Sequence, residues 1–179
     1  FGTGGGNERL LIDSAGLATF ANGIAFTQTG TAATGAATTS STLDHYEEGT
    51  WTVTMTCGSG TITVDTATDL MRYTRVGRVV HFSGQFTVGA ISSPLSWTRI
   101  VGLPFPVGAG TEGQSLSSGS VWANVFASNC GGDGLQLEVN ATYDWMYLHA
   151  FDGQDKINIS SFIGVGTYLV ISGSYTTDA

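Results

Sequence analysis

The sequence predicts an all-β protein: an antiparallel, jelly-roll-like β-sandwich preceded by a short β-rich stalk. In residues 51–57, apolar side chains alternate with threonine, the period of two that marks a half-buried strand. The chain has 26 glycines among 179 residues and only three prolines, a composition that suits short strands joined by tight turns. Because no segment repeats its apolar residues at the helical period of about 3.6, we expect no helix.

The first 29 residues predict three very short strands. Apolar side chains fill residues 10–12, 17–20 and 24–26, and turn residues separate them at 13–16 and 21–23. Strands this short cannot form a core within one chain, so we expect them to pack against copies of themselves as an oligomeric stalk. The alternative is an N-terminal arm that lies on the main domain. The chain begins at Phe1 and not at methionine, which is typical of a fragment or a processed product.

A neck follows the stalk. Residues 30–42 contain only Gly, Ala, Thr and Ser, a composition that cannot supply a core and predicts an extended linker. We therefore divide the chain into residues 1–42, the stalk and neck, and residues 43–179, the sandwich domain.

The sandwich domain contains about eight to ten predicted strands. We expect a loop around Pro94, and Pro104 and Pro106 exclude a central strand from their segment. The turns recur every 8–15 residues or so, which favours two antiparallel sheets. The predicted strands are residues 51–57, 62–64, 70–75, 80–88, 97–101, 121–126, 135–139, 145–151 and 168–175.

The charge of the chain limits its partners. Six Lys and Arg residues face fourteen Asp and Glu residues, a net charge of -8 that argues against a duplex nucleic acid or an anionic membrane. A neutral or cationic ligand is favoured. No stretch of about 18 apolar residues and no basic-apolar leader is present, so we expect no membrane insertion.

The sequence predicts no enzyme, no metal site and no cofactor. His45, His81 and His149 each lack a second His or Cys at ligand spacing, and no nucleophile elbow, Walker loop or dinucleotide fingerprint occurs. Glu47 with Glu48, and Asp152 with Asp155, are the carboxylate pairs that a glycosidase reading would need, but acidic loop residues are common and we assign them no catalysis.

Two local features have a structural interpretation. We read residues 152–158 as a turn between strands and not as a calcium loop, because the spacing and the bidentate glutamate of an EF-hand are missing. Alternation places Cys57 inward, so we interpret it as a packed thiol, and whether it pairs with Cys130 stays open.

The candidate binding residues come from two rows of aromatic side chains. Alternation puts Trp145, Tyr147, His149 and Phe151 on one face of a strand, and Trp122, Asn124 and Phe126 on one face of another. Only one face of a sandwich strand meets the core, so a second aromatic row faces a neighbouring subunit, a covering loop or a ligand. Aromatic rings beside amides and carboxylates suit sugars. The candidates are Trp122, Asn124, Trp145, Tyr147, His149 and Asp152; a subunit interface explains the rows at least as well.

Four segments resemble, in order, the C-terminal domain of bacteriophage tail-fibre and tail-spike proteins: LDHYEEGTW at 43–51, YTRVGRVV at 73–80, IVGLPF at 100–105 and ISGSY at 171–175. The segment ERLLIDSAG at 8–16 is similar to fibre-shaft segments of the same proteins. The resemblance implies a homotrimer with a sandwich-type domain at the distal tip of a virion tail fibre, made in the host cytoplasm. It implies no shared catalytic motif.

The resemblance leaves three functions open. The first is a receptor-binding module that recognises a host cell-surface polysaccharide. The second is a structural cap for trimerisation and folding, without a ligand of its own. The third and weakest is a lobe of a polysaccharide depolymerase.

Overall fold

The structure is a computed structural model that describes residues 10–20, 23–26, 42–43, 45–110, 117–124, 134–152, 155–160 and 162–178, with the side chains of 152 and 155–158 left out. These residues contain strands and no helix. Accordingly, no described helix has the length and apolar character needed to cross a membrane. The chain divides into two compact units, Phe1–Tyr46 and Glu47–Ala179, whereas from the sequence we divide it after residue 42.

The N-terminal unit contains two small antiparallel pairs. β1 (Leu10–Ile12) pairs with β2 (Ala18–Phe20), and β3 (Ile24–Ala25) pairs with β4 (Thr42–Leu43). Asp13 holds the β1–β2 turn, because its Oδ1 accepts hydrogen bonds from the backbone N–H groups of Ala15 (2.8 Å) and Leu17 (2.9 Å). The short strands predicted at 10–12, 17–20 and 24–26 are therefore confirmed, while residues 30–41 of the predicted neck lie outside the description.

The apolar side chains of this unit do not bury one another. Ile12 is 62% exposed and Leu17 is 65% exposed, and Leu11, Phe20, Ile24 and Phe26 are also exposed. In a single chain these apolar side chains are thus in contact with water. The strands are too short to bury them against one another.

The C-terminal unit is built on a single sheet of nine strands. Its strands are β5 (Tyr46–Thr52), β6 (Thr54–Val64), β7 (Leu70–Val76), β8 (Val79–Val101), β9 (Ser117–Asn124), β10 (Gly134–Val139), β11 (Trp145–Asp152), β12 (Asp155–Asn158) and β13 (Tyr168–Thr176).

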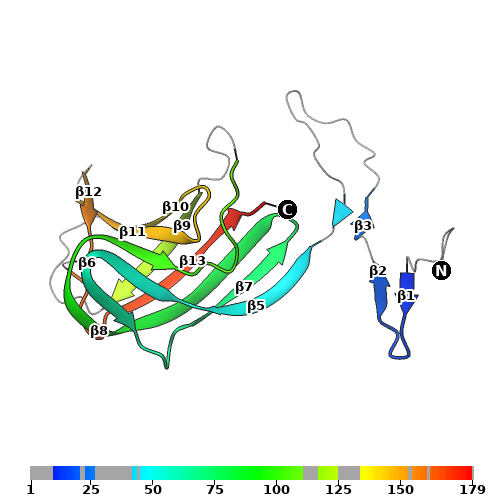
Figure 1. Cartoon of the computed structure of the whole chain (residues 1–179), viewed down its shortest axis with the longest axis horizontal. Coiled ribbons are helices and arrows are strands. Elements are labelled where there is room, and N and C mark those ends of the chain that lie inside the picture. The colour runs from blue at the N-terminus through cyan, green and yellow to red at the C-terminus, as the bar shows by residue number, and fades with distance from the viewer. Residues whose placement is uncertain are drawn as a thin grey trace. The chain divides into compact units, whose positions relative to one another are not determined.

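The long strand β8 closes this sheet into a barrel. Its first part pairs with β13, from Val79 opposite Thr176 to Thr87 opposite Tyr168. Its last part pairs with β11, and β11 leads back to β13 through β10 and β9. Figure 1 shows β8 in green, running beside the red strand β13. The ring β8–β13–β9–β10–β11 leaves no free edge between its members.

The predicted jelly-roll sandwich is confirmed only as an all-β fold. A sandwich keeps two sheets apart, whereas here β8 belongs to both sides of the molecule and joins them by hydrogen bonds. From the sequence we predict two strands, 80–88 and 97–101, with a loop at Pro94. The prediction of a loop is wrong, because β8 continues through the proline. Ser93 and Ser96 have positive φ angles of 42° and 69°, and the β6–β8 register shifts beside them, so bulges accommodate Pro94.

The core lies inside this barrel and alternates as predicted. Phe86 on β8 and Met146 on β11 are fully buried, as are Leu169 on β13 and Val53 between β5 and β6. Tyr175 is buried as well, and its hydroxyl donates to the carbonyl of Phe105 at 2.9 Å. Alternation then directs the intervening side chains outward, so the side chains that a ligand could reach lie on the outer face.

Candidate functional site

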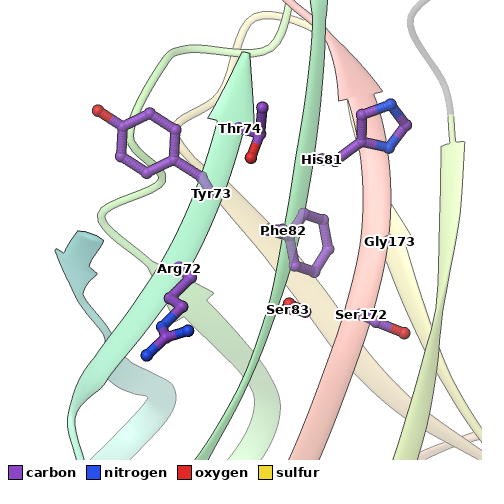
Figure 2. A pocket seen from close by; sticks show the side chains of 8 residues that line it. All are labelled: Arg72, Tyr73, Thr74, His81, Phe82, Ser83, Ser172 and Gly173. Atoms are coloured by element: carbon purple, nitrogen blue, oxygen red, sulfur yellow. The ribbon is translucent and has the colours of Figure 1, made fainter. Parts of the chain in front are cut away.

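The outer face of β7, β8 and β13 carries a polar groove. Figure 2 shows the three neighbouring strands that supply its walls. The groove has a volume of about 430 Å³. The central row, Tyr73–Phe82–Gly173, turns its side chains inward or has none, and the rows on either side point outward. The lining residues are Arg72, Tyr73, Thr74, His81, Phe82, Ser83, Ser172 and Gly173.

Two registered rows border the groove. On one side Arg72 pairs with Ser83, and Ser83 pairs with Ser172; on the other side Thr74 pairs with His81. Arg72, His81 and the two serines are exposed, and Thr74 is half-buried. The groove therefore presents hydroxyl, imidazole and guanidinium groups to solvent.

At position 173, in the floor of this groove, only glycine fits, because the Phe82 ring packs directly against the backbone there. A Cβ on Gly173 would lie 2.8 Å from Cζ of Phe82 and 3.1 Å from the Cα of Gly119. The Phe82 ring therefore occupies the space that a side chain on β13 would fill.

An aromatic platform lies next to the groove on the same face. Trp122 of β9 is 56% exposed, and its ring meets Tyr168 of β13 edge-on, with centroids 6.0 Å apart. The Tyr168 hydroxyl donates a hydrogen bond to Oε1 of Gln85. Asn124, paired with Tyr168 across the strands, is exposed. Since Gln85 is two residues from Ser83, the platform begins about 7 Å from the groove.

The second predicted aromatic row lies on β11 and is packed against itself. Tyr143 stacks on Trp145 with centroids 4.3 Å apart and an interplanar angle of 26°. Cζ of Arg99 lies 3.9 Å from the centroid of the same Trp145 ring. Two flat groups this close to one centroid cannot share a face, so both faces of Trp145 are covered.

Arg99 organises the rest of this cluster. Its guanidinium also lies 4.0 Å from the Trp97 centroid, and its Nη2 donates to the Tyr147 hydroxyl at 2.8 Å. Tyr147 in turn contacts His149, which is buried, with ring centroids 5.1 Å apart. Nε2 of His149 lies 3.4 Å from Oε2 of Glu138 on β10. The contacts of Trp145, Tyr147 and His149 are thus largely internal to the domain.

The structure separates the predicted binding residues into two places. Tyr147 pairs with Glu138, which pairs with Ser118 on β9, and Trp122 lies four residues, about 13 Å, further along β9. Trp122 and Asn124 therefore belong to the outer platform, and Trp145, Tyr147 and His149 belong to the Arg99 cluster. The side chain of Asp152, with Phe126 and Cys130, lies outside the description.

Sequence reasoning missed most of the groove. Alternation in 80–88 does put His81, Ser83 and Gln85 on one face. Their partner Arg72 lies on the preceding strand β7, but Ser172 and Tyr168 come from β13, far away in the chain. A period of two identifies which side chains point outward, and only strand pairing decides which of them are neighbours.

Two tyrosines near the groove have raised pKa values. A hydrogen bond to Glu47 raises the pKa of the Tyr73 hydroxyl, with smaller contributions from burial and from the charge of Glu47. Burial raises the pKa of Tyr175 to about 12, although its hydrogen bond to Phe105 acts in the opposite direction.

The described side chains include no group of three or more His, Cys, Asp or Glu residues that could hold a metal ion. Of the predicted carboxylate pair on β5, Glu47 is engaged with the Tyr73 hydroxyl. Cys57 is half-buried and its thiol donates to the Ser59 carbonyl at 3.0 Å, as expected for a packed cysteine.

Fold and surface together define an all-β barrel domain with a polar, aromatic-edged outer face. No known family model matches the chain, and no curated protein matches it either. Among solved structures, the Dettilon tailspike protein (gp208) is similar, with a TM-score of 0.60 and 21% identity over 73% of this chain. The match shows a shared fold with part of a tailspike, and it covers 24% of the tailspike chain.

Proposed function

We propose that this chain is the receptor-binding part of a phage tail fibre or tailspike and binds a polysaccharide on the bacterial surface. The observation that carries the proposal is the outer face of β9, β13 and β8, where the exposed Trp122 ring stands beside Tyr168, Gln85 and the polar groove. The shared fold with a tailspike supports a location in the virion tail.

The platform has the chemistry that a sugar ring needs. An exposed indole offers a flat apolar face to the C–H face of a pyranose, while hydroxyl and amide groups around it exchange hydrogen bonds with sugar hydroxyls. Trp122 supplies the first, and Gln85, Asn124 and Ser172 supply the second. The Arg99 cluster is a weaker candidate, because the faces of Trp145 are already covered.

We also propose that the chain acts as a homotrimer. The exposed apolar side chains of β1, β2 and β3 favour assembly, because a copy of the same strands would remove them from water. Three sites on one particle would bind a repetitive polysaccharide by multivalency, so a single site needs only millimolar affinity. We propose binding without catalysis; release of reducing ends from a bound polysaccharide would contradict this.

The test is a whole-cell and glycan-array binding assay on the purified chain, with light scattering to measure its mass. Trp122→Ala should reduce binding about 5- to 30-fold and leave the mass and fold unchanged, since stacking on one sugar is worth about 1–2 kcal/mol. Leu95→Ala is the control, because it removes an exposed apolar side chain of β8 that lines neither the groove nor the aromatic platform. Equal binding by Trp122→Ala and the parent chain would refute this site.

The alternative function is a structural cap that trimerises and folds a tail fibre without a ligand of its own. The exposed apolar strands of the N-terminal unit favour it, because strands this short bury their side chains only after copies have been brought together, and a barrel that trimerises would do this without binding a ligand. Deleting residues 43–179 should then prevent assembly of the remaining fibre. A stable trimer of the whole chain that binds neither cells nor glycans would select this function over the first.

A further inference from the structure

We propose that the groove between β7, β8 and β13 binds an oxyanion, a carboxylate or phosphate group carried by the polysaccharide. This inference rests on the proposed function and specifies the class of glycan. It departs from the expectation, based on net charge, of a neutral or cationic ligand.

Among the described residues, Arg72 differs from the other arginines in having no protein partner for its charge. The structure describes the surroundings of four arginines, and three of them are engaged. Nε of Arg75 donates to the Gly77 carbonyl at 2.9 Å, Arg78 pairs with Asp178 at 3.3 Å, and Arg99 is held between Trp97 and Trp145. Within the described part of the chain, Arg72 has no hydrogen bond or ion pair, and it lines the groove.

The wall of the groove is rich in hydrogen-bond donors. Among the described residues that line it there is no aspartate or glutamate, in a chain with fourteen of them. Arg72 can only donate hydrogen bonds, and the Thr74, Ser83 and Ser172 hydroxyls can also donate. A wall rich in donors and free of carboxylates suits an oxyanion better than a neutral hydroxyl group.

Arg72 and His81 are spaced to hold one anion between them. Arg72 pairs with Ser83, and His81 is two residues from Ser83 on the same strand, so Arg72 and His81 are diagonal neighbours. Such neighbours lie about 7–8 Å apart, a gap that a carboxylate or phosphate bound by both side chains would fill. The volume of about 430 Å³ also lies within the range of small-ligand sites, large enough for one acidic sugar residue.

The overall negative charge does not oppose such a site at short range. At physiological ionic strength, charges on the surface are screened beyond about 8 Å, so remote carboxylates contribute little to the potential inside the groove. Glu47 is nearer, because its carboxylate accepts a hydrogen bond from the hydroxyl of the lining residue Tyr73, and its charge opposes the anion. The donors in direct contact with the anion decide its affinity, and Arg72 is the strongest of them.

The test uses titration calorimetry on the whole chain with three probes: oligogalacturonate, the same oligosaccharide with its carboxyls reduced to alcohols, and a poly(glycerol phosphate) oligomer. We expect at least one anionic probe to bind about tenfold or more tightly than the reduced probe. Preference for oligogalacturonate would identify the anion as a carboxylate, and preference for the glycerol phosphate polymer would identify it as a phosphate.

Two variants with the same change in net charge complete the experiment. Arg72→Gln should weaken the anionic probe about tenfold and leave the reduced probe unaffected, because only a charged donor in contact is lost. Arg78→Gln, which removes an arginine outside the groove, should leave both affinities unchanged. Equal effects of the two variants, equal affinity for all probes, or binding of no anionic probe would overturn the anion site. The cell-binding assay with Trp122→Ala tests the proposed function separately.

Discussion

Replacing Trp145 with alanine should destabilise the barrel much more than replacing Trp122. Trp145 has three ring contacts: Tyr143 at 4.3 Å, Tyr147 at 4.7 Å and the Arg99 guanidinium at 3.9 Å. Aromatic pairs contribute about 0.5–1.5 kcal/mol each and a cation–π contact about 0.5–2 kcal/mol, so their loss costs about 2–4 kcal/mol. Trp122 has one edge contact, with Tyr168, and should cost about 1 kcal/mol or less.

The assay is urea unfolding followed by far-UV circular dichroism, at one fixed chain concentration because oligomerisation stabilises the folded state. With an m-value of about 2 kcal/mol/M, Trp145→Ala should lower the unfolding midpoint by about 1–2 M, and Trp122→Ala by about 0.5 M or less. A double-mutant cycle of Trp145→Ala with Arg99→Gln should give a coupling energy of about 1 kcal/mol. Equal midpoint shifts for the two tryptophan variants would refute the assignment of Trp145 to the fold and Trp122 to the ligand.

Two further predictions concern the barrel. Gly60→Ala should cost about 2–4 kcal/mol in urea unfolding, because Gly60 has a φ of 75° and an added Cβ would lie 2.2 Å from the Ser93 carbonyl oxygen; a loss below about 0.5 kcal/mol would contradict the bulge geometry. Because the pKa of Tyr175 is raised to about 12, from about 10 when unfolded, the folded state keeps a proton that the unfolded state loses between pH 10 and 12. The free energy of unfolding should fall there by roughly 2 kcal/mol, and Tyr175→Phe should flatten that slope; an unchanged slope would contradict it.

Much of the strand content could be predicted because alternation is local. Residues 145–151 alternate between large aromatic and smaller apolar side chains, and the structure buries Met146, Leu148 and Ala150 while Trp145 and Tyr147 point the other way. The same pattern placed Trp122 opposite Val121 and Ala123 correctly. Each of these predictions depends only on the period of a strand.

The continuity of β8 could not be predicted in the same way. Pro94 normally interrupts a ladder, and the sequence around it contains serines typical of loops. Two bulges let the strand pass through: one at Ser93, next to Gly60 of β6, and one at Ser96, next to Gly58 of β6. Because that compensation comes from another strand, the local sequence predicts a loop where the fold has a bent strand.

Composition and alternation were enough to predict the all-β class, the short apolar strands of the N-terminal unit and the outward side chains of most strands, although His149 of the predicted outer row is buried. The barrel closure by β8, the contact of Arg99 with Trp145 and the row of Arg72, Ser83 and Ser172 emerged only from the folded chain. Side-chain direction follows from the geometry of one strand, whereas neighbours across strands depend on pairing and register between segments.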